Sequence, residues 1–105
     1  MRKVIVQYKL KPGRAAENEQ LIKLVYQQLY EQQLAGFHYL TFKQEDGLSF
    51  VHLGFSDNEE ARTAFGNLPA FKNFTADIKD RCEIPPATSV ITDIIGAYNF
   101  SVDAN

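Results

Sequence analysis

Residues 56–74 read SDNEEARTAFGNLPAFKNF, and this stretch decides the fold. Asp57 followed three residues later by Glu60 forms a capping box, in which the first carboxylate accepts a free backbone N–H at a helix start and the second reaches back. Pro69 has no N–H to donate and suits a first helical turn, so a break is expected near residues 67–68. The stretch therefore predicts a second helix that begins at Asp57 and is divided into two pieces.

The segments around that helix have the periodicity of strands and of one longer helix. Residues 4–10 alternate with period two, and residues 14–35 carry apolar side chains at helical spacing up to Gly36. Two β-rich runs, 37–43 and 48–55, flank an Asp-Gly pair that favours a hairpin turn, and a last strand is expected over residues 88–98. The order β-α-β-β-α-β predicts an α+β, ferredoxin-like sandwich with an antiparallel sheet of strand order 4-1-3-2.

Length and composition set the class of protein. The chain has 105 residues, 45% of them hydrophobic, which suits one domain over residues 1–100 followed by a polar tail, residues 101–105. The net charge of −2 is spread along the chain, without the basic stripe that nucleic acid requires, so no nucleic-acid partner is expected. The apolar run at the N-terminus is too short to cross a membrane, and Cys82 is the single cysteine, so we expect a cytoplasmic protein without a membrane partner.

The sheet has more apolar residues than one layer of helices can cover. One face is predicted to hold Val4, Val6 and Tyr8 with Val51, Leu53 and Phe55. The other face is predicted to hold Ile5 with Phe50 and with Ile91 or Ile95. Burial of apolar area contributes about 25 cal/mol per Å², so the uncovered face favours self-association. A homodimer is the expected assembly.

Polar side chains interrupt the apolar pattern of three strands. With the strand order given above, Gln7 is expected between His52 and Asp93, in a row that a water or a ligand can bridge. His52 titrates near neutral pH, and a carboxylate nearby favours its protonated form. The alternative is structural, since a symmetric dimer interface can satisfy buried polar groups with its mate or with trapped water.

Other candidate groups are expected to have structural roles. His38 is predicted to be a solvated residue at a strand edge, and two histidines without a Cys/Asp/Glu cluster have no metal-ligand spacing, so no metal is expected. Cys82 is predicted to be a buried thiol. Several aromatic residues either fill the space between helices and sheet or line a pocket for a flat ligand: Tyr8, Phe55, Phe65, Phe71 and Phe74.

The order of elements resembles the dimeric α+β barrel superfamily and, within it, the antibiotic-biosynthesis-monooxygenase-like proteins. Three segments carry the resemblance: KVIVQYKLKPG at residues 3–13, FVHLGFSDNEEARTAF at residues 50–65 and LPAFKNF at residues 68–74. The resemblance implies ferredoxin-like protomers that pair their sheets into a barrel. It also implies a cofactor-independent monooxygenase that acts on a small aromatic or polyketide-like molecule. No haem is expected, since neither His38 nor His52 falls on the second helix, where haem-degrading members carry their ligand.

Two hypotheses of function remain. In the first, the protein is an enzyme without cofactor, in which His52 or Tyr8 handles a proton in an apolar pocket. The predicted ligand-binding residues of that pocket are Gln7, Asp93, Phe55, Phe65 and Phe74. In the second, the protein is a non-catalytic homodimeric module that binds a small apolar or aromatic molecule or only assembles.

Overall fold

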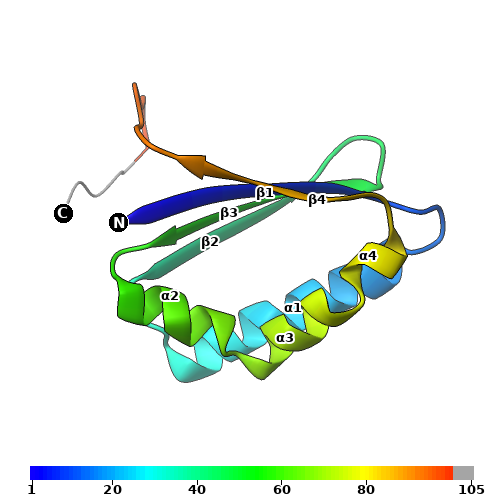
Figure 1. Ribbon diagram of the computed structural model, residues 1–105, viewed down its shortest axis with the longest axis horizontal. Coiled ribbons are helices and arrows are strands. Elements are labelled where there is room, and N and C mark those ends of the chain that lie inside the picture. The colour runs from blue at the N-terminus through cyan, green and yellow to red at the C-terminus, as the bar shows by residue number, and fades with distance from the viewer. Residues whose placement is uncertain (101–105) are drawn as a thin grey trace.

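The computed structural model describes residues 1–100 and has one four-stranded antiparallel sheet with helices on one side (Figure 1). The strand order β2-β3-β1-β4 is the predicted order 4-1-3-2 written from the other edge, so the predicted fold is confirmed. The elements, in chain order, are β1 (Arg2–Leu10), α1 (Ala15–Gln32), β2 (Phe37–Lys43), β3 (Ser49–Ser56), α2 (Glu59–Gly66), α3 (Pro69–Ala76), α4 (Ile78–Arg81) and β4 (Cys82–Ile91). The tail predicted over residues 101–105 lies outside the described residues.

The helices pack side by side beneath the sheet, and we call the sheet face toward them the inner face (Figure 1). The buried core lies between that face and the helices, and its largest fully buried apolar side chains are Leu10, Val25 and Leu68. The opposite, outer face is covered by no described element (Figure 1). No helix among residues 1–100 has the length and apolar content needed to cross a membrane.

The second helical region begins one residue later than expected. The N-cap is Asn58, whose side-chain Oδ1 accepts a hydrogen bond from the backbone N–H of Ala61 at 2.8 Å. The predicted capping box of Asp57 and Glu60 is therefore wrong. Asp57 instead lies 3.1 Å from the Nε2 atom of His38, an exposed residue as predicted. Asparagine and aspartate cap helices about equally well, so the sequence DN offers two adjacent starts.

The predicted break in this region is confirmed. α2 ends at Gly66 and α3 restarts with Pro69 in its first turn, where a missing N–H costs nothing. A second break near Asp77 separates the short α4 from α3, so the region has three pieces rather than two.

The last strand lies earlier in the chain than expected. β4 covers Cys82–Ile91 and includes Pro85 and Pro86, which the sequence-based prediction placed before the strand, whereas residues 92–98 form no strand. β4 is an edge strand, where a proline without an N–H is tolerated. The pairing of β4 with β1 also shifts register between Gln7 and Leu10, next to the prolines.

The strand register corrects the predicted faces of the sheet. Val6 lies opposite His52 and Tyr8 lies opposite Phe50, so these four residues share the inner face. Val51, Leu53 and Phe55 lie on the outer face with Ile5. The prediction that they share a face with Val4, Val6 and Tyr8, and that Phe50 lies with Ile5, is therefore wrong. A register shift by one residue exchanges the faces, and in β3 the outward set of alternate residues is the more apolar one.

Candidate functional site

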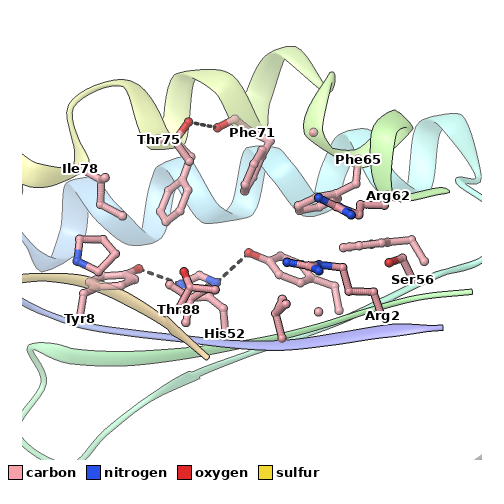
Figure 2. Close-up of a pocket in the computed structure, with 18 residues that line it drawn as sticks. Arg2, Tyr8, His52, Ser56, Arg62, Phe65, Phe71, Thr75, Ile78 and Thr88 are labelled. Carbon is pink, nitrogen blue, oxygen red and sulfur yellow. Dashed lines mark hydrogen bonds between the residues drawn. The ribbon is translucent and has the colours of Figure 1, made fainter. Parts of the chain in front are cut away.

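A cavity of about 440 Å³ lies between the inner face of the sheet and the helices α2 and α3 (Figure 2). Its long direction runs from Tyr8 and Ile78 at one end to Arg2, Arg62 and Ser56 at the other, as Figure 2 shows. Cavities of this size are typical of sites for small organic molecules. The lining is mainly apolar, with His52 at its floor.

Aromatic rings form much of the cavity wall. The Phe37 and Phe65 rings stack with centroids 4.0 Å apart and planes inclined by 17°. The Phe65 centroid also lies 5.0 Å from that of Tyr39 and 4.4 Å from that of Phe71. These rings come from β2, α2 and α3, so the flat apolar surfaces that face the cavity depend on the packing of helices on the sheet. Flat aromatic ligands suit such a wall, because rings stack or pack edge to face.

A chain of hydrogen bonds enters the cavity floor from the buried Arg81. Arg81 is 1% exposed, and its Nη2 atom donates to the backbone oxygen of Phe74 at 2.7 Å. Its Nε atom donates to Asn18 Oδ1 at 3.2 Å, and the amide nitrogen of Asn18 donates to the Tyr8 hydroxyl oxygen at 2.8 Å. The Tyr8 hydroxyl lies 2.8 Å from Nε2 of His52. The chain thus connects a buried cation to the imidazole at the cavity floor.

The other ring nitrogen of His52 continues the chain. Nδ1 lies 2.7 Å from the Tyr39 hydroxyl and 3.2 Å from Oγ1 of Thr41. Oγ1 of Thr41 is also 2.9 Å from the hydroxyl of Tyr26 on α1. Both nitrogens of the imidazole are therefore engaged by hydroxyl groups.

The direction of donation along this chain follows from its first member. A guanidinium only donates, so the Asn18 oxygen faces Arg81 and the Asn18 NH₂ group faces Tyr8. The Tyr8 oxygen is then an acceptor, and its own proton has one acceptor at hand, Nε2 of His52. Neutral His52 must carry its proton on Nδ1, which donates to Tyr39 or Thr41. The opposite tautomer would leave the buried Tyr8 proton unpaired, at a cost of about 1–3 kcal/mol.

Burial sets the protonation of these groups. It lowers the pKa of His52 to about 4, so the imidazole is neutral at pH 7. It raises the pKa values of Tyr8 and Tyr39 above the ordinary value of tyrosine, and both remain protonated. At neutral pH the chain is a series of uncharged hydrogen bonds that begins at the charged Arg81.

Four of the residues predicted from the sequence lie together in the cavity lining: Tyr8, His52, Phe65 and Phe74. The other three do not. Gln7 pairs with Val51 on the outer face, Phe55 also lies on that face, and Asp93 follows the end of β4. The predicted row of Gln7, His52 and Asp93 is therefore wrong, since His52 lies on the opposite face of the sheet from Gln7.

Five residues of the hydrogen-bond chain were not predicted: Asn18, Tyr26, Tyr39, Thr41 and Arg81. Asn18 had a signal in the sequence, because it lies four residues before Ile22 on the buried stripe of α1. Tyr39 lies two residues after Phe37 and so shares its face of β2. Arg81 had no such signal, because it ends a four-residue helix too short to have a periodic pattern.

Two further predictions concern metal ions and the thiol. Among residues 1–100, no group of three or more His, Cys, Asp or Glu side chains is placed to hold a metal ion. Cys82 is buried at the start of β4, as predicted, and burial raises the pKa of its thiol despite the neighbouring Arg81.

Comparisons with known proteins match this chain by structure and not by sequence. Neither the protein-family models nor the sequences of curated proteins contain a match to the chain. Solved structures, by contrast, include several that match the chain over most of its length. An antibiotic biosynthesis monooxygenase superimposes with a TM-score of 0.74 and 17% identity, over 90% of this chain and 99% of its own. The protein Rv0793 from Mycobacterium tuberculosis has a TM-score of 0.75 and 17% identity, over 92% of this chain and 98% of its own.

A third structure is that of an oxygenase from Streptomyces nogalater. It is a mutant form of SnoaB, described as a cofactor-independent oxygenase, with a TM-score of 0.65 and 14% identity over 88% of this chain and 91% of its own. Identities this low establish the fold and leave the chemistry open. The chain therefore has the fold of the antibiotic-biosynthesis-monooxygenase-like proteins.

Proposed function

We propose that the protein binds a small, flat aromatic or polyketide-like molecule in the cavity and acts on it as a cofactor-independent, oxygenase-like enzyme. The observation that carries the proposal is the aromatic cavity of about 440 Å³ with a neutral, hydrogen-bonded histidine at its floor. Apolar lining with a few convergent polar groups is typical of sites that orient a small ligand. The oxygenase part of the proposal is supported by the shared fold of SnoaB.

The proposal gives each polar group at the cavity floor a role. Tyr39 lines the cavity, and at 2.7 Å its hydroxyl oxygen is the nearer of the two acceptors of the Nδ1 proton of His52. When it accepts that proton's hydrogen bond, its own proton is available to an oxygen atom of the ligand. Donation from Tyr39 stabilises negative charge that develops on that oxygen, as preorganised donors do in oxyanion sites. His52 and Tyr8 then act as positioning residues, which hold Tyr39 in its donor role, rather than as the base that removes a proton.

Oxygen uptake tests this function. The purified protein is incubated with electron-rich phenols and aromatic ketones in air, and oxygen consumption and product masses are followed against an anaerobic control. The expected result is turnover that falls about 10²-fold or more in Tyr39→Phe, the loss typical of an oxyanion donor. Native mass spectrometry of the freshly purified protein identifies a retained ligand. Turnover that is unchanged in Tyr39→Phe contradicts the role of this hydroxyl.

The second candidate function is a non-catalytic module that binds the same kind of molecule. One observation favours it: both nitrogens of His52 are engaged, and its pKa of about 4 makes it a weak base. This candidate predicts a retained ligand in the mass spectrum and no oxygen uptake with any of the compounds.

The proposed location is the cytoplasm, because Cys82 is the single cysteine of the sequence and an internal disulfide cannot form.

The proposed assembly is a homodimer formed through the outer face of the sheet. Large apolar side chains on this face remain exposed in the single chain: Leu40 at 55%, Phe42 at 49% and Ile84 at 57%. Ile5, Val51, Leu53 and Phe55 continue the same surface on the neighbouring strands. A contiguous apolar face of this kind favours association with a second copy over exposure to water.

A further inference from the structure

Two arginines lie at one end of the cavity. Arg2 belongs to β1 and Arg62 to α2, and both line the main cavity and a smaller adjoining hollow of about 380 Å³. Figure 2 shows their side chains on the sheet side and on the helix side of the same end, next to Ser56. The cavity thus has an apolar body and a cationic end.

The charge at this end is not balanced by the protein. Three basic side chains, Arg2, Lys3 and Arg62, line the two hollows, and Glu59 is their one acidic residue. Glu59 Oε2 lies 3.5 Å from Nη1 of Arg62, but the Glu59 side chain is 79% exposed, so this ion pair is weak. Within residues 1–100, Arg2 forms no ion pair. This local excess of positive charge contrasts with a chain of net charge −2.

We infer that the ligand is an aromatic carboxylate, with its rings among the aromatic side chains of the cavity and its carboxylate between Arg2 and Arg62. The inference rests on the proposed function, because it concerns the same cavity. The guanidinium group presents its N–H donors in a planar fork that matches the two oxygens of a carboxylate. The long direction of the cavity, from Tyr8 to the arginines, lets one elongated molecule reach both the apolar body and the cationic end.

A pair of isosteric probes tests the charge requirement. 2-Naphthoate and 2-naphthamide have the same ring system and nearly the same shape, but only the first is an anion at pH 7. Their dissociation constants are measured by equilibrium dialysis at low ionic strength, because salt screens exposed charges. Hydrogen bonds to charged groups contribute about 1.5–3 kcal/mol, so naphthoate is expected to bind at least about tenfold more tightly than naphthamide.

Variants locate the effect. Arg2→Gln and Arg62→Gln remove charge from exposed side chains and are expected to lower the affinity for naphthoate with little change for naphthamide. In the double variant the ratio of the dissociation constant of naphthamide to that of naphthoate is expected to fall close to one. Arg14→Gln is the matched control, because Arg14 is paired with Glu17 at 2.8 Å and does not line the cavity. Circular dichroism of each variant checks that the fold is kept.

The outcomes separate this inference from the proposed function. Equal binding of the two probes by the unmodified protein overturns the carboxylate inference and leaves the aromatic site standing. A preference for naphthoate that persists in the double variant also overturns it, because the charge is then recognised elsewhere. Binding of neither probe overturns both this inference and the proposed aromatic site.

Discussion

The buried imidazole of His52 makes stability depend on pH. Its pKa is about 4 in the folded protein and 6.5 in the unfolded chain, so between these values the unfolded state binds more protons. His52 therefore makes its full contribution to the free energy of unfolding above pH 6.5, and this contribution is lost as the pH is lowered toward 4. The loss has an upper limit of about 3 kcal/mol. Urea unfolding at pH values from 4 to 8 measures it.

The two histidines of the chain provide the control for this prediction. His52→Gln removes the titrating group from the cavity floor and is expected to flatten the pH dependence between 4 and 6.5. His38→Gln changes an exposed residue and is expected to keep the slope of the unmodified protein. An equal slope in His52→Gln means that other groups cause the acid sensitivity.

The substitution Asn18→Asp is expected to reverse the direction of the hydrogen-bond chain. An aspartate accepts from both Arg81 and Tyr8, so the Tyr8 proton turns away from His52. The Tyr8 oxygen must then accept from Nε2 of His52, and the neutral imidazole changes from the Nδ1–H to the Nε2–H tautomer. Long-range ¹⁵N–¹H NMR spectra of histidine-labelled protein at pH 7 distinguish the two tautomers.

Tyr39→Phe is the control for the tautomer. This variant removes a partner of Nδ1 but leaves Tyr8 and Asn18 in place, and Thr41 remains 3.2 Å from Nδ1. The Nδ1–H tautomer is expected to persist. An Nε2–H signal in the unmodified protein contradicts the deduced direction, as does an Nδ1–H signal in Asn18→Asp.

The sequence predicts which residues line the cavity better than it predicts how they are arranged. His52, Tyr8 and two phenylalanines were found because aromatic and polar side chains in strands and helices stand out in a periodic pattern. Gln7 was misplaced because the face of a strand residue depends on the pairing register, which is a long-range property. In β3 the more apolar set of alternate residues faces outward, so hydrophobicity alone selects the wrong face.

At the scale of the secondary-structure elements, the start of α2 depends on one side chain. Asn58→Ala removes the acceptor for the Ala61 N–H and is expected to destabilise the protein by about 1 kcal/mol, as measured by urea unfolding. Asp57→Ala is the control, because that exposed carboxylate only pairs with the exposed His38, and a change of at most about 0.5 kcal/mol is expected. A larger effect of Asp57→Ala than of Asn58→Ala assigns the cap to residue 57.

The boundaries of other elements show when the local sequence is sufficient to predict where a helix or strand begins. Pro69 predicted the break between α2 and α3 correctly, because a proline in a first turn is a local property. Pro85 and Pro86 predict a boundary before the last strand, whereas β4 contains both. Their tolerance depends on β4 being an edge strand, which only the assembled sheet determines.

At the scale of the whole molecule, the two faces of the sheet have different surroundings. The inner face, with the helices, builds the cavity and the hydrogen-bond chain, while the outer face carries exposed apolar side chains without a described covering. The apolar excess that predicts a homodimer from the sequence is present on the outer face. Ile5 and Ile91 lie there as predicted, whereas Phe50 and the outward residues of β3 were assigned to the wrong faces. The prediction of self-association depended on the number of apolar residues, and that number does not change with register.

Phe42→Glu is expected to convert the proposed homodimer into a monomer. Phe42 lies on the outer face of β2 and is 49% exposed in the single chain, so a charge there is tolerated by the folded protomer but is buried without a partner in the dimer. Sedimentation equilibrium is expected to give twice 11.9 kDa for the unmodified protein and 11.9 kDa for the variant. Ile95→Glu is the matched control, because Ile95 is 95% exposed beyond the end of β4 and its variant is expected to remain dimeric. A monomeric unmodified protein contradicts the assembly, and a dimeric Phe42→Glu variant places the interface on another surface.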